Sequence, residues 1–216
     1  MNMKRVVTAL LSGVAFFGIF APSAQAQFAE GLYVQAGGGA SFPNRIGTSL
    51  GTAINLNTGY TAFGAIGYGI NNGFRIEGEF AYSSFDVSSL VFQGNTSAGR
   101  GDIDTYSGLV NIYYDLLFPE ITDIVSPYIG AGAGVSSISA NNITAPGFTT
   151  VNGSSTVFAY QFKAGLGFRL GSSATILLGY RYFATAAPGF TDNLGTSLTT
   201  DSPNIHNVEL GFRFSF

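Results

Sequence analysis

Apolar and polar residues alternate along several segments of this chain, for ten or more residues at a time. The clearest stretch is FAYQFKAGLGFRL at 158–170, where every second residue from Phe158 onward is apolar while Lys163 and Arg169 occupy intervening positions. A period of two places successive side chains on opposite faces of a strand. The pattern therefore predicts β-strands with one apolar face and one polar face.

Eight segments carry this alternation, and stretches rich in Gly, Asn, Ser, Thr and Pro separate them. The alternation and the 30 glycines of the chain disfavour helices. We predict an all-β antiparallel fold whose strands occupy residues 31–41, 58–70, 74–85, 103–117, 126–137, 156–170, 174–184 and 205–216.

Periodicity alone does not say which face meets water. Only 10% of the residues are charged, whereas water-soluble domains carry about 25%. The segments reach the length of about nine to eleven residues that a tilted strand needs to cross a hydrocarbon layer. The alternative is a soluble sandwich or a lipocalin-like barrel, in which the apolar face points inward.

The lengths of the connecting segments favour the membrane interpretation. Short links at 71–73 and 171–173, with a somewhat longer one at 118–125, alternate with four much longer links. Short turns at one end and long loops at the other are typical of outer-membrane barrels, with the turns in the periplasm. We therefore predict an eight-stranded antiparallel up-and-down transmembrane β-barrel. Its external loops are predicted at residues 42–57, 86–102, 138–155 and 185–204.

Charged residues lie on the polar face of the predicted strands, with five positive against four negative side chains. An eight-stranded barrel is too narrow for a wide channel, and an unpaired buried charge is expensive. We therefore predict that these residues form a network of salt bridges that fills the lumen. The network comprises Arg75, Glu77, Glu79, Asp115, Lys163, Arg169, Arg181, Glu209 and Arg213.

The first residues have the pattern of an export signal. Lys4 and Arg5 precede the apolar stretch VVTALLSGVAFFGIFA, and Ala24-Gln25-Ala26 supplies a cleavage motif of small residues. We predict a cleavable signal peptide at 1–26 and a barrel at 27–216. The chain contains no cysteine, which excludes disulfides and thiolate metal sites, and it has no basic patch for nucleic acid.

Three stretches resemble the small OmpA-like and Opa-like outer-membrane barrel family, which includes alphaproteobacterial surface antigens. They are VELGFRFSF at 208–216, PYIGAGAGV at 127–135 and LLGYRYF at 177–183. The resemblance implies a Gram-negative outer-membrane location, envelope integrity and a surface-antigen role. It also implies an assembly signal that the barrel-assembly machinery reads, formed by Leu210, Phe212, Phe214 and Phe216.

Candidate chemistry is sparse. His206 is the single histidine. Its expected outward neighbours are Ala36, Gly38 and Ala40 on one side and Tyr180, Tyr182 and Ala184 on the other. None of them is a serine, which a serine hydrolase would need beside the imidazole. Asp102 and Asp104 have the spacing of two calcium ligands but lack the rest of a calcium loop. Glu77 and Glu79 could form an acid/base pair, and the charge balance favours them instead as partners of Arg75 and nearby cations.

We predict a non-catalytic barrel without cofactor or metal, monomeric, surrounded by outer-membrane lipid, whose external loops meet host or environmental ligands. Two alternatives remain open. A pore would conduct in planar bilayers, and if the lumen is plugged, neutralising Arg181 or Lys163 should raise leakage. A lipid A-modifying enzyme would depend on His206.

Overall fold

A computed structural model describes residues 31–47, 52–92, 95–116, 124–144, 151–191 and 197–216. The predicted signal peptide lies outside these residues, so its cleavage stays a prediction. Among the described residues, no helix is long and apolar enough to cross a membrane. The strands are β1 (Gly31–Pro43), β2 (Ile46–Gly47), β3 (Thr52–Leu56), β4 (Gly59–Gly69), β5 (Phe74–Phe92), β6 (Asn95–Ala98), β7 (Arg100–Asp115), β8 (Val125–Thr144), β9 (Val151–Leu170), β10 (Ala174–Thr185), β11 (Gly189–Thr191), β12 (Ser197–Thr199) and β13 (Asn204–Ser215).

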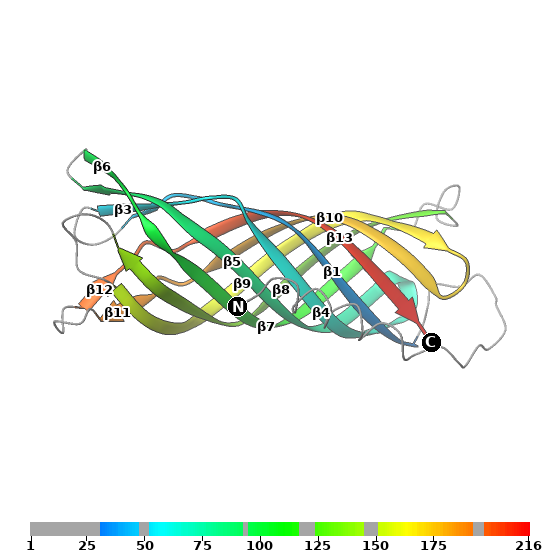
Figure 1. Cartoon of the computed structure of the whole chain (residues 1–216). Helices are drawn as coiled ribbons and strands as arrows, with labels where there is room; N and C mark the ends of the chain where they lie inside the picture. Colours follow the sequence, from blue (N-terminus) through cyan, green and yellow to red (C-terminus); the bar gives the residue numbers. More distant parts are fainter. Residues whose placement is uncertain (1–30, 48–51, 93–94, 117–123, 145–150, 192–196) are drawn as a thin grey trace.

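Eight long strands form a closed antiparallel ring in the order β1, β4, β5, β7, β8, β9, β10, β13, and β13 pairs back to β1. Figure 1 shows the resulting cylinder, with the carboxyl end at the end of the short turns and β3, β6, β11 and β12 at the opposite end. The predicted fold class is confirmed. Closure leaves no unpaired sheet edge in the ring, which is the condition for β-structure in lipid.

The stagger of the strands fixes the width of the barrel. Following partners once around the ring from Phe74 leads to Ser84, ten residues further along β5. Eight strands with this stagger tilt by about 40° and enclose a lumen just wide enough for side chains to fill. The path runs through Tyr114, Ile129, Ala164, Tyr180, Val208, Ala40 and Tyr60.

The short turns follow from local sequence. Asn71–Gly73 forms a one-turn 3₁₀ segment in which Asn72 has φ 70° and Gly73 φ 86°. Two successive positive φ angles suit Asn-Gly, the sequence of the tightest hairpin turns. The turn between β9 and β10 likewise places Gly171 at φ 83°.

The strands extend much further into the long loops than the sequence predicted. β5 ends at Phe92 instead of residue 85, β8 ends at Thr144 instead of 137, and β9 begins at Val151 instead of 156. At about 2.5 Å of axial rise per tilted residue, the 19 residues of β5 span about 45 Å. The hydrocarbon band of such barrels is only about 25 Å tall. The barrel therefore projects well beyond the membrane at its external end.

Candidate functional site: the charged lumen

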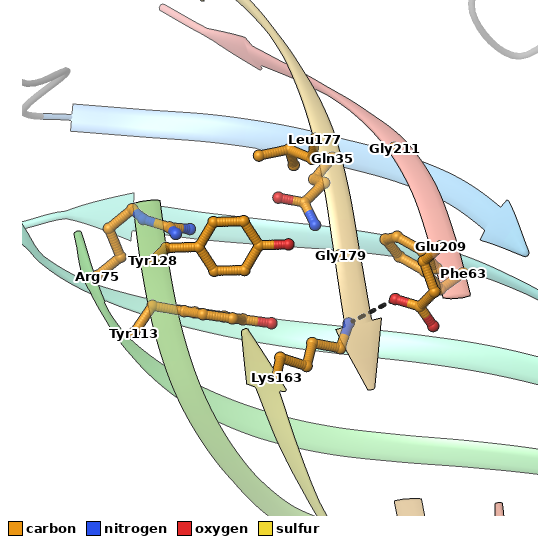
Figure 2. Close-up of a pocket in the computed structure, with 10 residues that line it drawn as sticks. All are labelled: Gln35, Phe63, Arg75, Tyr113, Tyr128, Lys163, Leu177, Gly179, Glu209 and Gly211. Carbon is orange, nitrogen blue, oxygen red and sulfur yellow. Dashed lines mark ion pairs between the residues drawn. The ribbon is translucent and has the colours of Figure 1, made fainter. Parts of the chain in front are cut away.

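Four buried charged residues form the centre of the lumen. Lys163 Nζ lies 2.6 Å from Glu79 Oε2 and 3.5 Å from Glu209 Oε2. Arg181 places Nη2 3.1 Å from Glu79 Oε1 and Nε 2.7 Å from Glu209 Oε1. Each cation thus contacts both acids, and the four charges sum to zero. We call Glu79, Lys163, Arg181 and Glu209 the central cluster; Figure 2 shows Lys163 reaching toward Glu209.

The strand register explains why these residues meet. Lys163 on β9 and Arg181 on β10 are direct cross-strand partners, an arrangement that is repulsive by itself. Glu209 arrives from the neighbouring strand β13, where it pairs with Gly179 of β10. Glu79 reaches across the lumen from β5, which is not paired with β9, β10 or β13. The central cluster therefore ties opposite walls of the barrel together.

Amide and aromatic side chains complete the shell of the central cluster. Gln161 Nε2 donates hydrogen bonds to Glu79 Oε1 at 3.2 Å and to Asn111 Oδ1 at 2.7 Å. The ring of Phe63 lies 4.5 Å from Lys163 Nζ and 5.2 Å from Arg181 Cζ, measured to its centroid. An aromatic face attracts desolvated cations, so Phe63 stabilises both positive charges without adding a competing acceptor.

A second ion pair lies nearer the short-turn end. Arg75 donates two hydrogen bonds to Asp115, from Nε at 2.8 Å and from Nη2 at 2.9 Å. Its guanidinium also lies 4.6 Å from the ring centroid of Tyr113. The sequence interpretation made Glu77 and Glu79 partners of Arg75 and nearby cations; Glu79 does pair with the cations Lys163 and Arg181, but Arg75 forms its ion pair with neither acid. Bidentate geometry selects Asp115, which lies on the adjacent strand β7 with its carboxylate directed at the guanidinium fork.

Glu77 is the buried acid without an ion pair in the described part of the chain. It accepts hydrogen bonds from Tyr33 Oη at 3.0 Å, from Tyr113 Oη at 3.2 Å and from Asn111 Nδ2 at 3.5 Å. Arg213 lies on the other side of Tyr33, with Cζ 5.5 Å from the ring centroid. Tyr33 therefore separates a carboxylate from a guanidinium and contacts both.

Arg213 and Arg169 occupy the edge of this network. The Nε and Nη1 atoms of Arg213 are buried and have no hydrogen-bond partner among the described residues. Arg169 is half-buried near the end of β9, opposite Thr175 of β10. The ion pairs given above join Arg75 to Asp115 and Lys163 and Arg181 to Glu79 and Glu209. Neutral donors surround Glu77, and Arg169 and Arg213 lie toward the short-turn end.

The sequence interpretation did not name the aromatic side chains that fill the lumen beside the charges. Tyr33, Phe63, Tyr113 and Tyr128 are all buried, and they share the inward parity of the charged positions. Lumen-facing glycines make room for them: a Cβ on Gly67 would lie 2.2 Å from Tyr33 Cζ, and one on Gly130 would lie 2.2 Å from Tyr113 Cδ1. The signal was present as aromatic residues in register with glycines.

Little space remains between these side chains. The cavity beside the central cluster has a volume of about 10 Å³, which is roughly the room for one water molecule. The residues of Figure 2 line it from several walls of the barrel. They are Gln35, Phe63, Arg75, Tyr113, Tyr128, Lys163, Leu177, Gly179, Glu209 and Gly211.

The outer wall is apolar between two aromatic bands. Ile66, Val110 and Leu210 are about 60% exposed, at 62%, 60% and 60%, and face away from the lumen. Rings cluster where a membrane interface is expected: Tyr82 contacts Tyr106 at 5.0 Å and Tyr60 at 6.0 Å between centroids. Toward the short turns, Phe74 contacts Tyr114 at 4.8 Å. We call Tyr60, Tyr82, Tyr106, Tyr160, Tyr180 and Tyr182 the tyrosine girdle.

The residues of the predicted assembly signal lie on the last strand and its end. Leu210, Phe212 and Phe216 are exposed, and the ring of Phe214 contacts that of Phe216 at 5.3 Å. Their outward direction suits contact with lipid. Recognition by the assembly machinery stays a prediction.

His206 lies in the tyrosine girdle. Its Nδ1 is 2.5 Å from Tyr180 Oη, and its ring lies 5.5 Å from that of Tyr182. Its partner on β1 is Phe42, not the predicted Ala36, Gly38 or Ala40, because β1 continues further than the sequence suggested. No serine contacts the imidazole within the part of the chain that the structure describes.

The two aspartates considered for calcium are used by neighbouring side chains. Asn141 Nδ2 donates hydrogen bonds to Asp102 at 2.9 Å and to Asp104 at 3.1 Å, and Tyr82 Oη donates to Asp104 at 2.7 Å. Across the described ranges, no group of three or more His, Cys, Asp or Glu residues could hold a metal ion.

A closed eight-stranded cylinder with an apolar wall and a charged, filled interior is a transmembrane β-barrel. The sequence profile of the family described as "Outer membrane protein beta-barrel domain" matches residues 11–216, and the chain belongs to this family. It is therefore a protein of the outer membrane of a Gram-negative bacterium, of the small OmpA-like type.

Individual relatives agree with this assignment. An "Outer membrane protein" of Gluconacetobacter diazotrophicus is 25% identical over 243 residues, which cover 98% of this chain and 64% of that protein. The chain thus spans somewhat under two thirds of the length of this relative. Neisserial surface protein A has a similar fold, with a TM-score of 0.58 and 20% identity over 88% of this chain and 100% of that one. OprG from Pseudomonas aeruginosa has a TM-score of 0.57 and 15% identity over 87% of this chain and 98% of that one.

Proposed function

We propose that this protein is a non-conducting, non-catalytic barrel that contributes to the integrity of the outer membrane and presents its external loops to the surroundings. The observation that carries the proposal is the filled lumen. The central cluster joins opposite walls, and the adjacent cavity holds about one water molecule. A continuous water path would need these contacts to separate.

The alternative pore makes the opposite prediction, and planar bilayers distinguish the two. Purified protein that shows heat-modifiability on unboiled gels is reconstituted, and the current is recorded. Silent bilayers support the filled lumen. Reproducible single-channel steps from the native sequence would overturn it.

The role in the envelope is tested in cells. We expect a deletion strain to become more sensitive to detergents and bile salts, and the native gene to restore resistance. Unchanged sensitivity would remove the envelope part of the proposal. Antibody binding to intact cells that carry an epitope inserted at residues 93–94, between β5 and β6, tests whether this loop faces outward.

The enzymatic alternative rests on His206 and has little geometric support. The imidazole contacts a phenol in the tyrosine girdle, and no hydroxyl of a serine contacts it among the described residues, as a serine hydrolase would require. Overexpression should leave the mass spectrum of lipid A unchanged. A new lipid A species that disappears in His206→Ala would establish the enzyme instead.

A further inference from the structure

The inward-facing residues of the barrel change from charged to apolar toward its external end, while the outward-facing residues change from apolar to polar. Toward the short turns, inward positions on β10 and β13 carry Arg181 and Glu209. Nearer the external end, the inward positions are apolar. Phe183 lies two residues beyond Arg181 on β10, and Ile205 lies four residues beyond Glu209 on β13. On β5, the inward residues change likewise from Glu77 and Glu79 to Phe85 and Val87.

The inward apolar residues form two packed groups. The first contains Phe85, Leu109, Ala159, Phe183 and Ile205, which are between 0% and 7% exposed. The second contains Val87, Leu90, Ala140 and Ile143, with Ile54 and Ile103 packed against it. Leu56 packs against both groups. We call these eleven residues and Leu56 the apolar column.

The apolar column crosses the lumen. Its first group joins β5 to β10 and β13, which are not hydrogen-bonded to β5, whereas its second group lies on the neighbouring strands β3, β5, β7 and β8. The first group therefore extends through the interior of the cylinder. Beyond the central cluster, the lumen contains packed hydrocarbon side chains together with buried hydroxyl groups such as those of Ser107 and Ser136.

Hydroxyl and amide groups form a polar layer above the central cluster, at the height of the first group of the column: Ser107 lies two residues nearer the external end of β7 than Leu109, a member of that group. Thr61 Oγ1 lies 2.7 Å from both Ser41 Oγ and Ser83 Oγ, and it donates a hydrogen bond to Asn207 Oδ1 at 3.2 Å. Ser107 and Ser136 contact each other at 3.0 Å. This layer could hold water, because its groups donate and accept hydrogen bonds.

The outer wall changes in the opposite direction at the same height. Beyond the tyrosine girdle, the outward positions of β5 and β7 carry Ser84, Asp86, Asp102 and Asp104. The projecting part of the sheet is thus built like the sheet of a water-soluble protein, with apolar residues on its inner face and polar residues on its outer face. Its core is stable in contact with water because burial of its apolar side chains does not depend on lipid.

From this arrangement we infer that the apolar column, and not the central cluster, is the permeability seal of the lumen. The inference rests on the proposed non-conducting function and names the residues responsible. Charged and hydroxyl groups can exchange one another for water, so a gap among them becomes hydrated. A packed hydrocarbon constriction resists wetting and blocks ions even after a nearby charge is lost.

Conductance of two matched variants tests the inference. Lys163→Met with Glu79→Gln removes one cation and one acid of the central cluster and keeps it neutral. Leu109→Ser with Phe183→Ser makes the column polar and leaves every charge in place. Each protein is first shown to be folded by its mobility on unboiled gels.

We expect the native protein and the charge variant to leave bilayers silent, in contrast to the leakage that the sequence alone predicted for a neutralised Lys163, and the column variant to give discrete steps. Conduction by the charge variant, or silence of a folded column variant, would overturn the inference while leaving the non-conducting native barrel intact. Conduction by the native protein would instead overturn the proposed function.

Cysteine labelling provides a second test that does not require a disruptive substitution. The chain has no native cysteine, and Ser136→Cys places a nearly isosteric thiol at a fully buried position of β8, on the short-turn side of Ala140 and Ile143 in the second group of the column. Thr96→Cys on β6 is an exposed reference. We expect a membrane-impermeant thiol reagent outside cells to modify Cys at 136 about two orders of magnitude more slowly than at 96, because access requires local opening. Equal rates would show that water and reagent pass the column.

Discussion

Loss of Lys163 should destabilise the barrel strongly, because it leaves two buried carboxylates with a single cation. Lys163 is 6% exposed and contacts both Glu79 and Glu209. In Lys163→Met, Arg181 alone faces both carboxylates, so the central cluster changes from neutral to a net charge of minus one. Removing one partner of a buried ion pair costs about 3–5 kcal/mol.

The double variant Lys163→Met with Glu79→Gln separates charge balance from packing. It removes one cation and one acid, and the pair of Arg181 with Glu209 at 2.7 Å remains. The two substitutions should be non-additive, with the double variant more stable than the sum of the single losses by about 2 kcal/mol or more.

The measurement is reversible urea unfolding in lipid vesicles, followed by far-UV circular dichroism and by mobility on unboiled gels, since the chain contains no tryptophan. A loss of about 4 kcal/mol moves the midpoint by roughly 2 M urea if the slope is about 2 kcal/mol/M. Additivity of the single losses to within about 0.5 kcal/mol, or a midpoint of Lys163→Met equal to that of the native protein, would refute the account of the central cluster.

Four further outcomes are expected. Arg213→Met should cost less than about 2 kcal/mol in the same unfolding assay, since a cation over an aromatic ring is the contact it loses; a loss as large as that of Lys163→Met would contradict this. Gly130→Val should lower stability by about 3 kcal/mol or prevent folding, because its side chain would overlap a buried tyrosine. Outward Gly108→Val, with nothing within 4 Å of the added Cβ, should be neutral and is the matched control. Phe216→Ser should reduce the amount of folded barrel in the outer membrane without accelerating unfolding of purified protein; undiminished assembly in cells would remove the terminal residue from the assembly signal. A spin label at residue 162 should report lipid and one at residue 211 the lumen, and the reverse result would invert the barrel.

The alternation of the sequence predicted most of the membrane part of the barrel. Phe162 and Lys163 alternate because a strand has two faces, and this local property needs no knowledge of neighbouring strands. The short turns were equally readable, since Asn72 and Gly73 suit positive φ angles wherever they occur. The scarcity of charge and the sorting of loop lengths then favoured lipid outside.

The partners of the charges were not predictable in the same way. Arg75 lies two residues from Glu77 and pairs instead with Asp115. Which side chains meet inside the cylinder depends on the stagger of ten residues around the ring, and a change in that stagger would bring different rows of residues together. Sequence spacing along one strand contains no such information.

The projecting part of the barrel was missed for a related reason. Val87, Leu90, Ala140 and Ile143 lie within stretches rich in polar and small residues, which the composition marked as loops. Bulges break the period of two there, at Asn55 and Leu56 and between Ala140 and Ile143. An apolar core assembled from a few residues of each strand becomes visible only when the strands are placed around one axis.

The sequence by itself thus determined which residues face the membrane and which face the interior, because that choice is made residue by residue along each strand. The tertiary structure alone decided how the interior is divided between charged and apolar layers. The physical reason is that contacts across the lumen join strands that are neither adjacent in sequence nor hydrogen-bonded, so the closure and stagger of the whole ring select them.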